Sequence, residues 1–238
     1  MEKEPVQFIT KVIKGIQYAV LNPEWEKFRL KKKYDLLLMQ SNIPHYYWDI
    51  EFDNYQGNKD SKSYQYTVDY AKNLATDKYK FTHMFLHGIQ STQKTAIACN
   101  ILKEGFRQGL RGYFILAGDL IDALLKIQGF SSSTNVEEYI EKIKNSDVLV
   151  IDDSFDSSKS LLWAKQESKN IIITEWDRFL RKILSSNTKV IMTSNLSIEI
   201  VEQNYGRSMY ELIQRNFTVL ELREPVVTTK QNKYKKEI

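Results

Sequence analysis

The sequence is poor in the residues that mark several classes of protein. It has one cysteine, Cys99, and three histidines among 238 residues. One cysteine excludes a disulfide framework, and so few cysteines and histidines exclude a zinc-ligand cluster. No apolar run approaches the ~18–20 residues that cross a bilayer, and the first residues, MEKEPVQF, lack the apolar core of a signal peptide. We therefore expect a cytoplasmic protein, in a reducing compartment, with no membrane partner.

The charge of the chain is nearly balanced. A net charge of +4 arises from 34 basic and 30 acidic residues, and 42% of the residues are apolar, as is usual for a globular protein. Two local basic runs are more informative, KKK at residues 31–33 and KQNKYKK at residues 230–236. Either run could contact nucleic-acid phosphates, but solvated surface charge would give the same letters.

Short apolar segments alternate with amphipathic ones from residue 67 onward. We expect strands at residues 82–86, 112–116, 147–151, 189–192 and 218–222, with helices between them. This order predicts an α/β fold, a mainly parallel sheet with helices on both faces. We expect four parts: an N-terminal helical region, a linker, the α/β domain and a basic tail, at residues 1–42, 43–66, 67–224 and 225–238. In the first part, Pro23 is expected to open the second of two helices.

A phosphate-binding loop is predicted between the first strand and the next helix. The pattern is glycine, four residues, then Gly-Lys-Thr/Ser, and the sequence matches it except that glutamine replaces the second glycine. Such a loop points backbone N–H groups and a helix N-terminus at an anion, and its lysine reaches the outer phosphates. The nucleotide contacts are therefore assigned to Gly88, Ile89, Gln90, Ser91, Thr92, Gln93, Lys94 and Thr95.

Two further strands end in polar residues. VLVI is followed by Asp152 and Asp153, so Asp152 could hold Mg²⁺ beside the Thr95 hydroxyl, and Asp153 could orient the attacking water. VIMTS is followed by Asn195, which could help to position that water. A core strand ending in an acidic turn, or an asparagine helix cap, would give the same letters.

Two arginines near helix ends are candidates for a residue that reaches a neighbouring subunit's phosphates. They are Arg207 and Arg215. Such an arginine neutralises charge that develops in the transition state of phosphoryl transfer. Most arginines at helix ends only compensate the helix dipole. The order of the candidate elements along the chain, rather than any one of them, favours an ATP site.

The ordered motifs GIQSTQKT, VLVIDD, MTSN and LIQRN resemble the AAA+ ATPases of the DnaC/DnaI helicase-loader and IstB group. SNIPHYYWDIEFDNY resembles the entry to that ATPase domain, and GYFILAGDLIDALL its second strand and helix. The resemblance covers roughly residues 43–224. It implies an AAA+ P-loop NTPase fold with ATP/ADP and Mg²⁺ as cofactors, and no long C-terminal lid.

The resemblance also implies roles for individual residues. Lys94 and Thr95 would form the Walker A site, and Asp152 and Asp153 the Walker B pair. Asn195 would be the sensor-1 residue. Arg215 would be the arginine finger acting in trans, with Arg207 as the second candidate. The adenine would lie near Phe52 and Tyr55.

The partners implied are a hexameric replicative DNA helicase, single-stranded DNA and further copies of the chain. Residues 1–42 would grip the helicase, or their apolar residues would pack on the chain's own ATPase domain. A phage or mobile-element origin in a bacterial cytoplasm fits the divergence from the family pattern. No cysteine cluster precedes the ATPase domain, so the zinc-bearing module of DnaI-type loaders is not expected.

Three functions stay open on these residues. The favoured one is an ATP-dependent helicase loader. An IstB-like ATPase that assists a transposase on DNA is the alternative with the same mechanism. A nucleotide-binding scaffold with impaired hydrolysis is the third, because the Gln93 side chain stands where backbone must approach phosphate closely.

Overall fold

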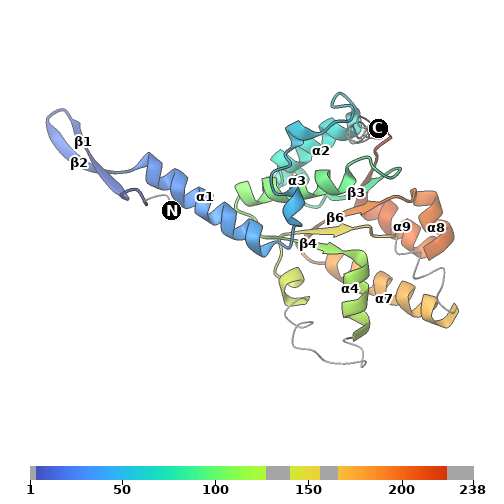
Figure 1. Ribbon diagram of the computed structural model, residues 1–238. Coiled ribbons are helices and arrows are strands. Elements are labelled where there is room, and N and C mark those ends of the chain that lie inside the picture. Colours follow the sequence, from blue (N-terminus) through green and yellow to red (C-terminus); the bar gives the residue numbers. More distant parts are fainter. Residues whose placement is uncertain (1–3, 127–139, 156–165, 224–238) are drawn as a thin grey trace, which may run out of the picture.

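The computed structural model describes residues 4–126, 140–155 and 166–223 (Figure 1). The basic tail expected at residues 225–238 lies outside the described residues, as do residues 127–139 and 156–165 between the strands. Among the helices in the described part, none combines the length and apolar character that a bilayer crossing requires.

A five-stranded parallel sheet forms the centre of the molecule. Its strands stand in the order β4-β5-β6-β3-β7, and every neighbouring pair is parallel. Their bounds are β3 His83–His87, β4 Gly112–Leu116, β5 Val148–Asp152, β6 Lys189–Ser194 and β7 Phe217–Glu221. All five strands were predicted, because continuous apolar runs are typical of strands buried on both faces.

Helices cover both faces of this sheet, as predicted (Figure 1). Met84 and Leu86 of β3 pack on one side with α2 and α3, whereas Phe85 between them packs on the other side with α4, α7, α8 and α9. This alternation follows from the two-residue repeat of a strand. The helices are α2 Lys62–Lys72, α3 Lys94–Arg107, α4 Ala117–Leu125, α7 Gln166–Leu184, α8 Ile198–Tyr205 and α9 Arg207–Asn216.

The N-terminal region is a β-hairpin followed by a helix, so the prediction of two helices in residues 1–42 is wrong in its first half. Strands β1 (Phe8–Ile13) and β2 (Ile16–Leu21) pair antiparallel, and Ile13 faces Ile16 across a two-residue turn. Lys14 and Gly15 in that turn both have positive φ, 51° and 77°. Two such residues form the tight turn whose twist suits a hairpin, and the flanking β-branched residues favour strands.

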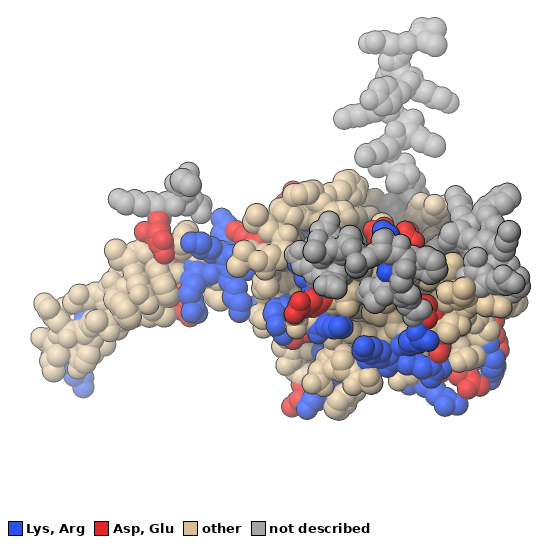
Figure 2. Space-filling model, turned by 90° about the horizontal axis from the view of Figure 1, so that it is seen from below, with Lys and Arg blue, Asp and Glu red and all other residues tan. Residues whose placement is uncertain are grey.

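Helix α1 (Pro23–Gln40) begins at Pro23, as predicted, with the Asn22 side chain accepting a hydrogen bond from the Glu24 N–H at 3.0 Å. Only Leu38 is buried on this helix. The hairpin and α1 together, residues 8–40, form an arm that projects from the body (Figure 1). Figure 2 shows basic side chains gathered between the hairpin and the body. The exposed cations that α1 carries there are Lys27, Arg29, Lys31, Lys32 and Lys33.

Residues 43–66, the entry segment, run from the arm to the sheet. They contain two short 3₁₀ helices, η1 (His45–Tyr47) and η2 (Phe52–Asn54), and the first turn of α2; a third, η3 (Asp77–Tyr79), precedes β3. Ile43, Phe52 and Tyr55 are buried in the core on the α3 side. The entry segment is therefore packed against the helix that follows the predicted phosphate loop.

Candidate nucleotide-binding site

Thr95 and Asp152 meet at the carboxyl edge of the sheet. Asp152 is the last residue of β5, and Thr95 lies in the first turn of α3, after β3 and the loop at residues 88–93. The Thr95 hydroxyl donates to both carboxylate oxygens of Asp152, at 3.0 and 3.1 Å. The hydroxyl of Thr193 on β6 donates to the same carboxylate. Two hydroxyls thus hold a buried carboxylate beside the N-terminus of α3.

The predicted loop closes around the ammonium group of Lys94. Its Nζ donates to the carbonyl oxygens of Gly88 and Ile89, at 2.9 and 2.8 Å, and to the Thr92 hydroxyl at 3.2 Å. The Thr92 hydroxyl in turn donates to the Ile89 carbonyl at 3.0 Å. Lys94 is buried as a result. A positive charge is therefore fixed inside the loop, at the start of a helix whose dipole also favours anions.

Gly88 has a conformation and surroundings that require glycine. Its φ is +148°, and a Cβ added there would lie 2.1 Å from the Leu222 carbonyl oxygen. Leu222 follows β7, and its N–H donates to the His87 carbonyl at 2.8 Å. The end of β7 therefore passes directly against the start of the loop.

Gln93 occupies a left-handed conformation at the N-cap of α3, with φ 61° and ψ 24°. This conformation costs a residue with a Cβ about 1–2 kcal/mol, and glycine almost nothing. The Gln93 side-chain oxygen accepts a hydrogen bond from the Gln56 N–H at 3.1 Å. The loop therefore has the backbone shape that a glycine would adopt, and the glutamine side chain ties it to the entry segment.

Asp153 and Asn195 lie at the same edge of the sheet and are exposed. Asp153 has a positive φ of 52°, and its N–H donates to the Thr193 hydroxyl at 3.1 Å. Asn195 directly follows β6, whose last residue, Ser194, is paired with His87 at the end of β3. The structure thus brings Lys94, Thr95 and Asp152 together and sets the other two predicted residues at the same edge.

Arg215 lies at the opposite edge of the sheet. It is in the last turn of α9, two residues before Phe217, and Phe217 pairs with His83 at the start of β3. The loop follows the far end of β3, about 13 Å away at 3.3 Å per residue. Arg215 is 76% exposed and pairs with Glu211 at 3.2 Å.

Arg207, at the start of α9, is held more firmly than Arg215. It pairs with Glu202 at 2.9 Å and with Glu211 at 3.0 Å, and its guanidinium lies over the Tyr210 ring. These three contacts hold the Arg207 side chain against α8 and α9. Of the two predicted arginines, Arg215 is therefore the better placed to reach another molecule.

A cavity of about 310 Å³ lies beside the loop. It is lined by Tyr55, Asn58, Ser61, Ser63, Glu221, Leu222 and Arg223. Leu222, one of these lining residues, passes directly against Gly88 at the start of the loop. Tyr55 stacks on Tyr64 with ring centroids 4.6 Å apart, whereas Phe52 packs edge-on against Tyr64 in the core. Of the two residues assigned to the adenine, Tyr55 lines the cavity. Phe52 does not line it but packs against Tyr64, the ring on which Tyr55 stacks.

Tyr47 joins this site although no role was predicted for it. Burial raises the pKa of its hydroxyl, and the Asp152 carboxylate raises it further, while an interaction with the Thr95 side chain lowers it. The Tyr47 side chain is half-buried and packs against the core on the α3 side of the sheet. The only signal in the sequence was its place in the IPHYY stretch.

The donor set suits Mg²⁺. Thr95 and Asp152 offer hard oxygen ligands, and in the described ranges no cluster of three or more His, Cys, Asp or Glu could hold a metal on its own. Mg²⁺ takes one or two protein oxygens and fills its remaining positions with water and phosphate. A softer metal would need imidazole or thiolate, and the Cys99 thiol is buried, which raises its pKa.

Solved structures share the fold. No protein-family model matches the sequence, and no curated protein matches it. The structure of the DnaC helicase loader is 21% identical, with a TM-score of 0.53, over 75% of this chain and 99% of that one. The DnaI structure is 15% identical, with a TM-score of 0.57, over 78% of this chain and 94% of that one.

The AMPPCP-bound replication initiator DnaA from Aquifex aeolicus is 14% identical, with a TM-score of 0.57, over 76% of this chain. This chain spans 51% of that DnaA chain. The resemblance drawn from the motifs is thus confirmed at the level of the fold. The chain has the fold of the AAA+ ATPase domains found in helicase loaders and replication initiators.

Proposed function

We propose that this protein is an ATP-dependent loader that places a hexameric replicative helicase on single-stranded DNA. The main support for an ATP site is the hydrogen bond from the Thr95 hydroxyl to the Asp152 carboxylate. It lies beside a loop whose carbonyl groups surround the Lys94 ammonium. The replication role is supported by the neighbours: DnaC is a helicase loader, and DnaA has been solved with AMPPCP and single-stranded DNA.

The site residues divide the work on the nucleotide. Backbone N–H groups of the loop and the Lys94 ammonium bind phosphate oxygens. When the nucleotide binds, hydrogen bonds from Lys94 to phosphate replace its hydrogen bonds to the Gly88 and Ile89 carbonyls. Thr95 and Asp152 would hold Mg²⁺, which would supply positive charge to the phosphates. Asp153 and Asn195 orient the attacking water, and the cavity at Tyr55 takes the adenine.

Assembly completes the site. Arg215 is separated from its own loop by the length of β3, so it can reach only the loop of a second copy. There it would neutralise the charge that develops on the transferred phosphoryl group. We therefore propose an oligomer in which each ATP lies between two copies of the chain.

The arm is the proposed helicase-binding part. Its hairpin exposes apolar side chains on both faces, with Phe8 58%, Val12 63% and Ile16 58% exposed. A lone two-stranded hairpin is only marginally stable in water, so a partner that covers it would stabilise it. Helix α1 has no single apolar face and spans about 27 Å, so we assign it the role of a spacer that holds the hairpin off the body.

Helicase binding by an arm variant tests this function. Val12→Thr with Ile16→Thr keeps the β-branched shapes but removes apolar surface from the hairpin. We expect this pair to weaken binding to the purified hexameric helicase at least about 10-fold, as truncated anchor residues do. Nucleotide binding should be unchanged. Ile200→Thr, at an exposed apolar position on α8, is the matched control.

Equal helicase binding by the arm variant and its control would contradict the assignment of the arm. Binding to a transposase instead of the helicase would favour the IstB-like alternative.

The strained loop favours a second candidate, a scaffold that binds nucleotide without turning it over. Its support is the left-handed Gln93, whose side chain is tied to Gln56. Helicase loading that persists in Lys94→Ala would favour the scaffold over the ATPase.

A further inference from the structure

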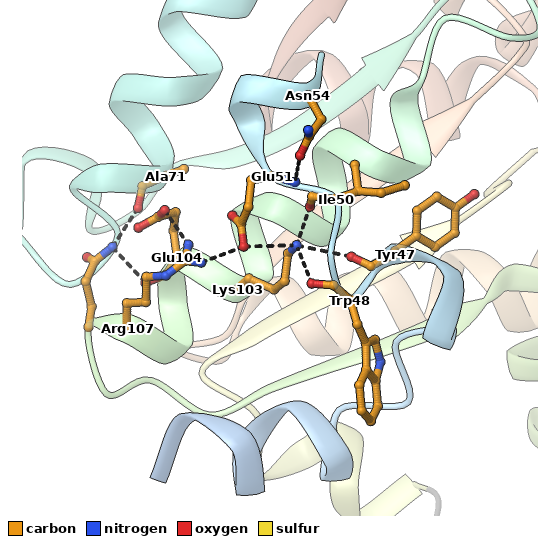
Figure 3. A network of polar contacts seen from close by, with 10 residues as sticks. Tyr47, Trp48, Ile50, Glu51, Asn54, Ala71, Lys103, Glu104 and Arg107 are labelled. Carbon is orange, nitrogen blue, oxygen red and sulfur yellow. Dashed lines mark hydrogen bonds and ion pairs between the residues drawn. The ribbon is translucent and has the colours of Figure 1, made fainter. Parts of the chain in front are cut away.

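A buried lysine fixes the entry segment to α3. Lys103 has no exposed side-chain surface, and its ammonium donates to the backbone carbonyls of Tyr47 at 3.1 Å, Trp48 at 3.2 Å and Ile50 (Figure 3). The Glu51 carboxylate lies 3.5 Å from the same nitrogen. The carbonyls lie at and just after the end of η1, where a helix leaves its last carbonyl groups without N–H partners. One buried cation therefore binds four oxygens from a single stretch of the entry segment.

The residues directly after this stretch form one closed turn that ends at the candidate nucleotide site. Arg107, one turn beyond Lys103 on α3, donates to the Glu51 carboxylate at 2.7 Å (Figure 3). The Glu51 N–H donates to the Asn54 side-chain oxygen at 2.7 Å. The N–H of Tyr55, whose side chain lines the cavity beside the loop, donates to the carbonyl at the start of η2 at 3.0 Å. The ring at the cavity thus follows the lysine contact by a single short turn.

A second contact joins the far end of this turn to the same helix. The Gln56 N–H donates to the side-chain oxygen of Gln93, the N-cap residue of α3, at 3.1 Å. Gln93 and Lys103 are ten residues apart on this helix, about 15 Å at 1.5 Å per residue. Residues 51–55 are therefore held at both ends by the helix that begins at Lys94, the residue assigned to the phosphates.

The Tyr55 ring has little freedom of its own within this segment. It stacks on Tyr64 with the ring planes 10° apart, and the Tyr64 hydroxyl donates to the Phe52 carbonyl at 2.8 Å. A Cβ at Gly57 would overlap the Tyr55 hydroxyl, so the ring fills the space that this glycine leaves. The separation between the ring and the phosphate loop therefore depends on where α3 holds the entry segment.

We propose that Lys103 is a positioning residue of the candidate nucleotide site, which fixes the separation between Tyr55 and the phosphate loop and thereby lets the site select a purine base. This inference rests on the proposed function, in which the cavity at Tyr55 takes the adenine. The phosphates and the base are parts of one molecule, so both must fit at once. A gap of about 0.5–1 Å already loses a quarter to a half of the attraction between surfaces in contact. A pyrimidine is smaller than a purine and contacts the cavity wall less, so it depends less on this separation.

Lys103→Met tests this inference, because methionine keeps the length of the stem and removes the ammonium. The dissociation constants of ATP and CTP, each with Mg²⁺, are measured for the full chain by titration calorimetry. We expect ATP to bind about 3- to 10-fold more weakly, part of what a well-placed base contributes, and CTP binding to stay within about twofold. The preference for ATP over CTP should therefore fall.

Lys189→Met is the matched control. Lys189 is also buried and also donates to backbone carbonyls, those of Tyr79 and Lys80. It lies at the start of β6, at the edge of the sheet opposite to the loop. Its loss should lower stability but leave the preference for ATP at the wild-type value.

Glu51→Ala replaces Lys103→Met if the lysine variant does not fold. It removes the carboxylate that Lys103 and Arg107 share, and the Glu51 side chain is 39% exposed, so its truncation leaves no buried cavity. We expect the same selective loss of ATP binding.

A wild-type chain that binds neither nucleotide would overturn the proposed function and this inference with it. Wild-type binding without a preference for ATP would overturn the inference alone. So would a preference that Lys103→Met, or Glu51→Ala in its place, leaves unchanged, or that Lys189→Met lowers equally. An equal loss of ATP and CTP binding in Lys103→Met would also overturn it, because Lys103 would then support the loop as a whole.

Discussion

Gln93 sets the properties of the loop at the scale of a single residue. Its backbone adopts the left-handed shape, so the glutamine does not unfold the phosphate cradle; it holds the cradle under strain. The hydrogen bond from Gln56 partly offsets that strain and places the side chain against the entry segment. Nucleotide binding should therefore be weakened by this residue and not abolished.

Gln93→Gly should tighten ATP binding about fivefold, since relief of the left-handed strain contributes on the order of 1 kcal/mol. Gln93→Ala keeps the strain and loses the hydrogen bond to Gln56, so it should bind ATP no better than wild type. Titration of each variant with ATP and Mg²⁺ measures the difference. If alanine tightens binding as much as glycine, the side chain and not the backbone strain limits binding.

The positions of the candidate site residues were predictable where a backbone motif fixes them. Lys94, Thr95 and Asp152 follow from the loop pattern and from a strand that ends in a carboxylate. The fixing of the entry segment at Tyr47 was not predictable, because it depends on the buried Lys103, 56 residues away, whose ammonium donates to the Tyr47 carbonyl. A lysine within a helical pattern looks solvent-exposed in the sequence, and nothing in the letters indicates that carbonyl groups surround it.

Most strands and helices were predictable, but the hairpin was not. Strand β4 was placed at its observed bounds, since GYFIL is short, apolar and flanked by turn residues. In the hairpin, apolar residues at positions 8, 9, 12, 13, 16 and 20 mimic a helical repeat. The competing signal was Lys14-Gly15, which is a weaker turn marker than Asn-Gly. The hairpin and α1 nevertheless project together from the body (Figure 1).

His83 makes the pairing of β3 with β6 sensitive to pH. Its Nδ1 accepts a hydrogen bond from the Val190 N–H at 3.1 Å, so the ring must be neutral. Burial lowers the pKa of His83 to about 4, and the Lys189 ammonium contributes to the shift. A pKa below the unfolded value of 6.5 means that stability is complete above pH 6.5 and is lost as the pH falls toward 4.

The loss from His83 should approach about 3 kcal/mol, at 1.36 kcal/mol per pKa unit. His83→Asn keeps an acceptor near Nδ1 but does not titrate, so its stability should fall less steeply between pH 6.5 and 4. Urea denaturation at several pH values gives both curves, and carboxylates contribute equally to each. Parallel curves would show that His83 does not carry this pH dependence.

At the scale of the whole molecule, the candidate nucleotide site and Arg215 lie at opposite edges of the sheet, and the arm projects from the body. The loop, Asp152 and the cavity at Tyr55 lie at the carboxyl ends of the strands, whereas Arg215 lies near the start of β7. The hairpin stands away from both (Figure 1). Such a layout suits a ring or spiral in which copies meet edge to edge while the arms stay available for a partner.

Mixing two inactive variants tests this assembly. Lys94→Ala disables its own site, and Arg215→Ala disables a neighbour's, so each alone should lose nearly all ATP turnover. In an equal mixture, about a quarter of the interfaces pair an intact Lys94 with an intact Arg215, so about a quarter of wild-type turnover should return. No recovery would mean that Arg215 acts within its own chain or only supports the fold.

The most direct test of the account is ATP binding and hydrolysis by the purified protein, with and without single-stranded DNA, beside Lys94→Ala. We predict that ATP binds with Mg²⁺, that hydrolysis depends on Lys94, and that single-stranded DNA changes its rate. Absence of ATP binding, or hydrolysis that persists unchanged in Lys94→Ala, would contradict the assignment of residues 88–95 as the nucleotide site.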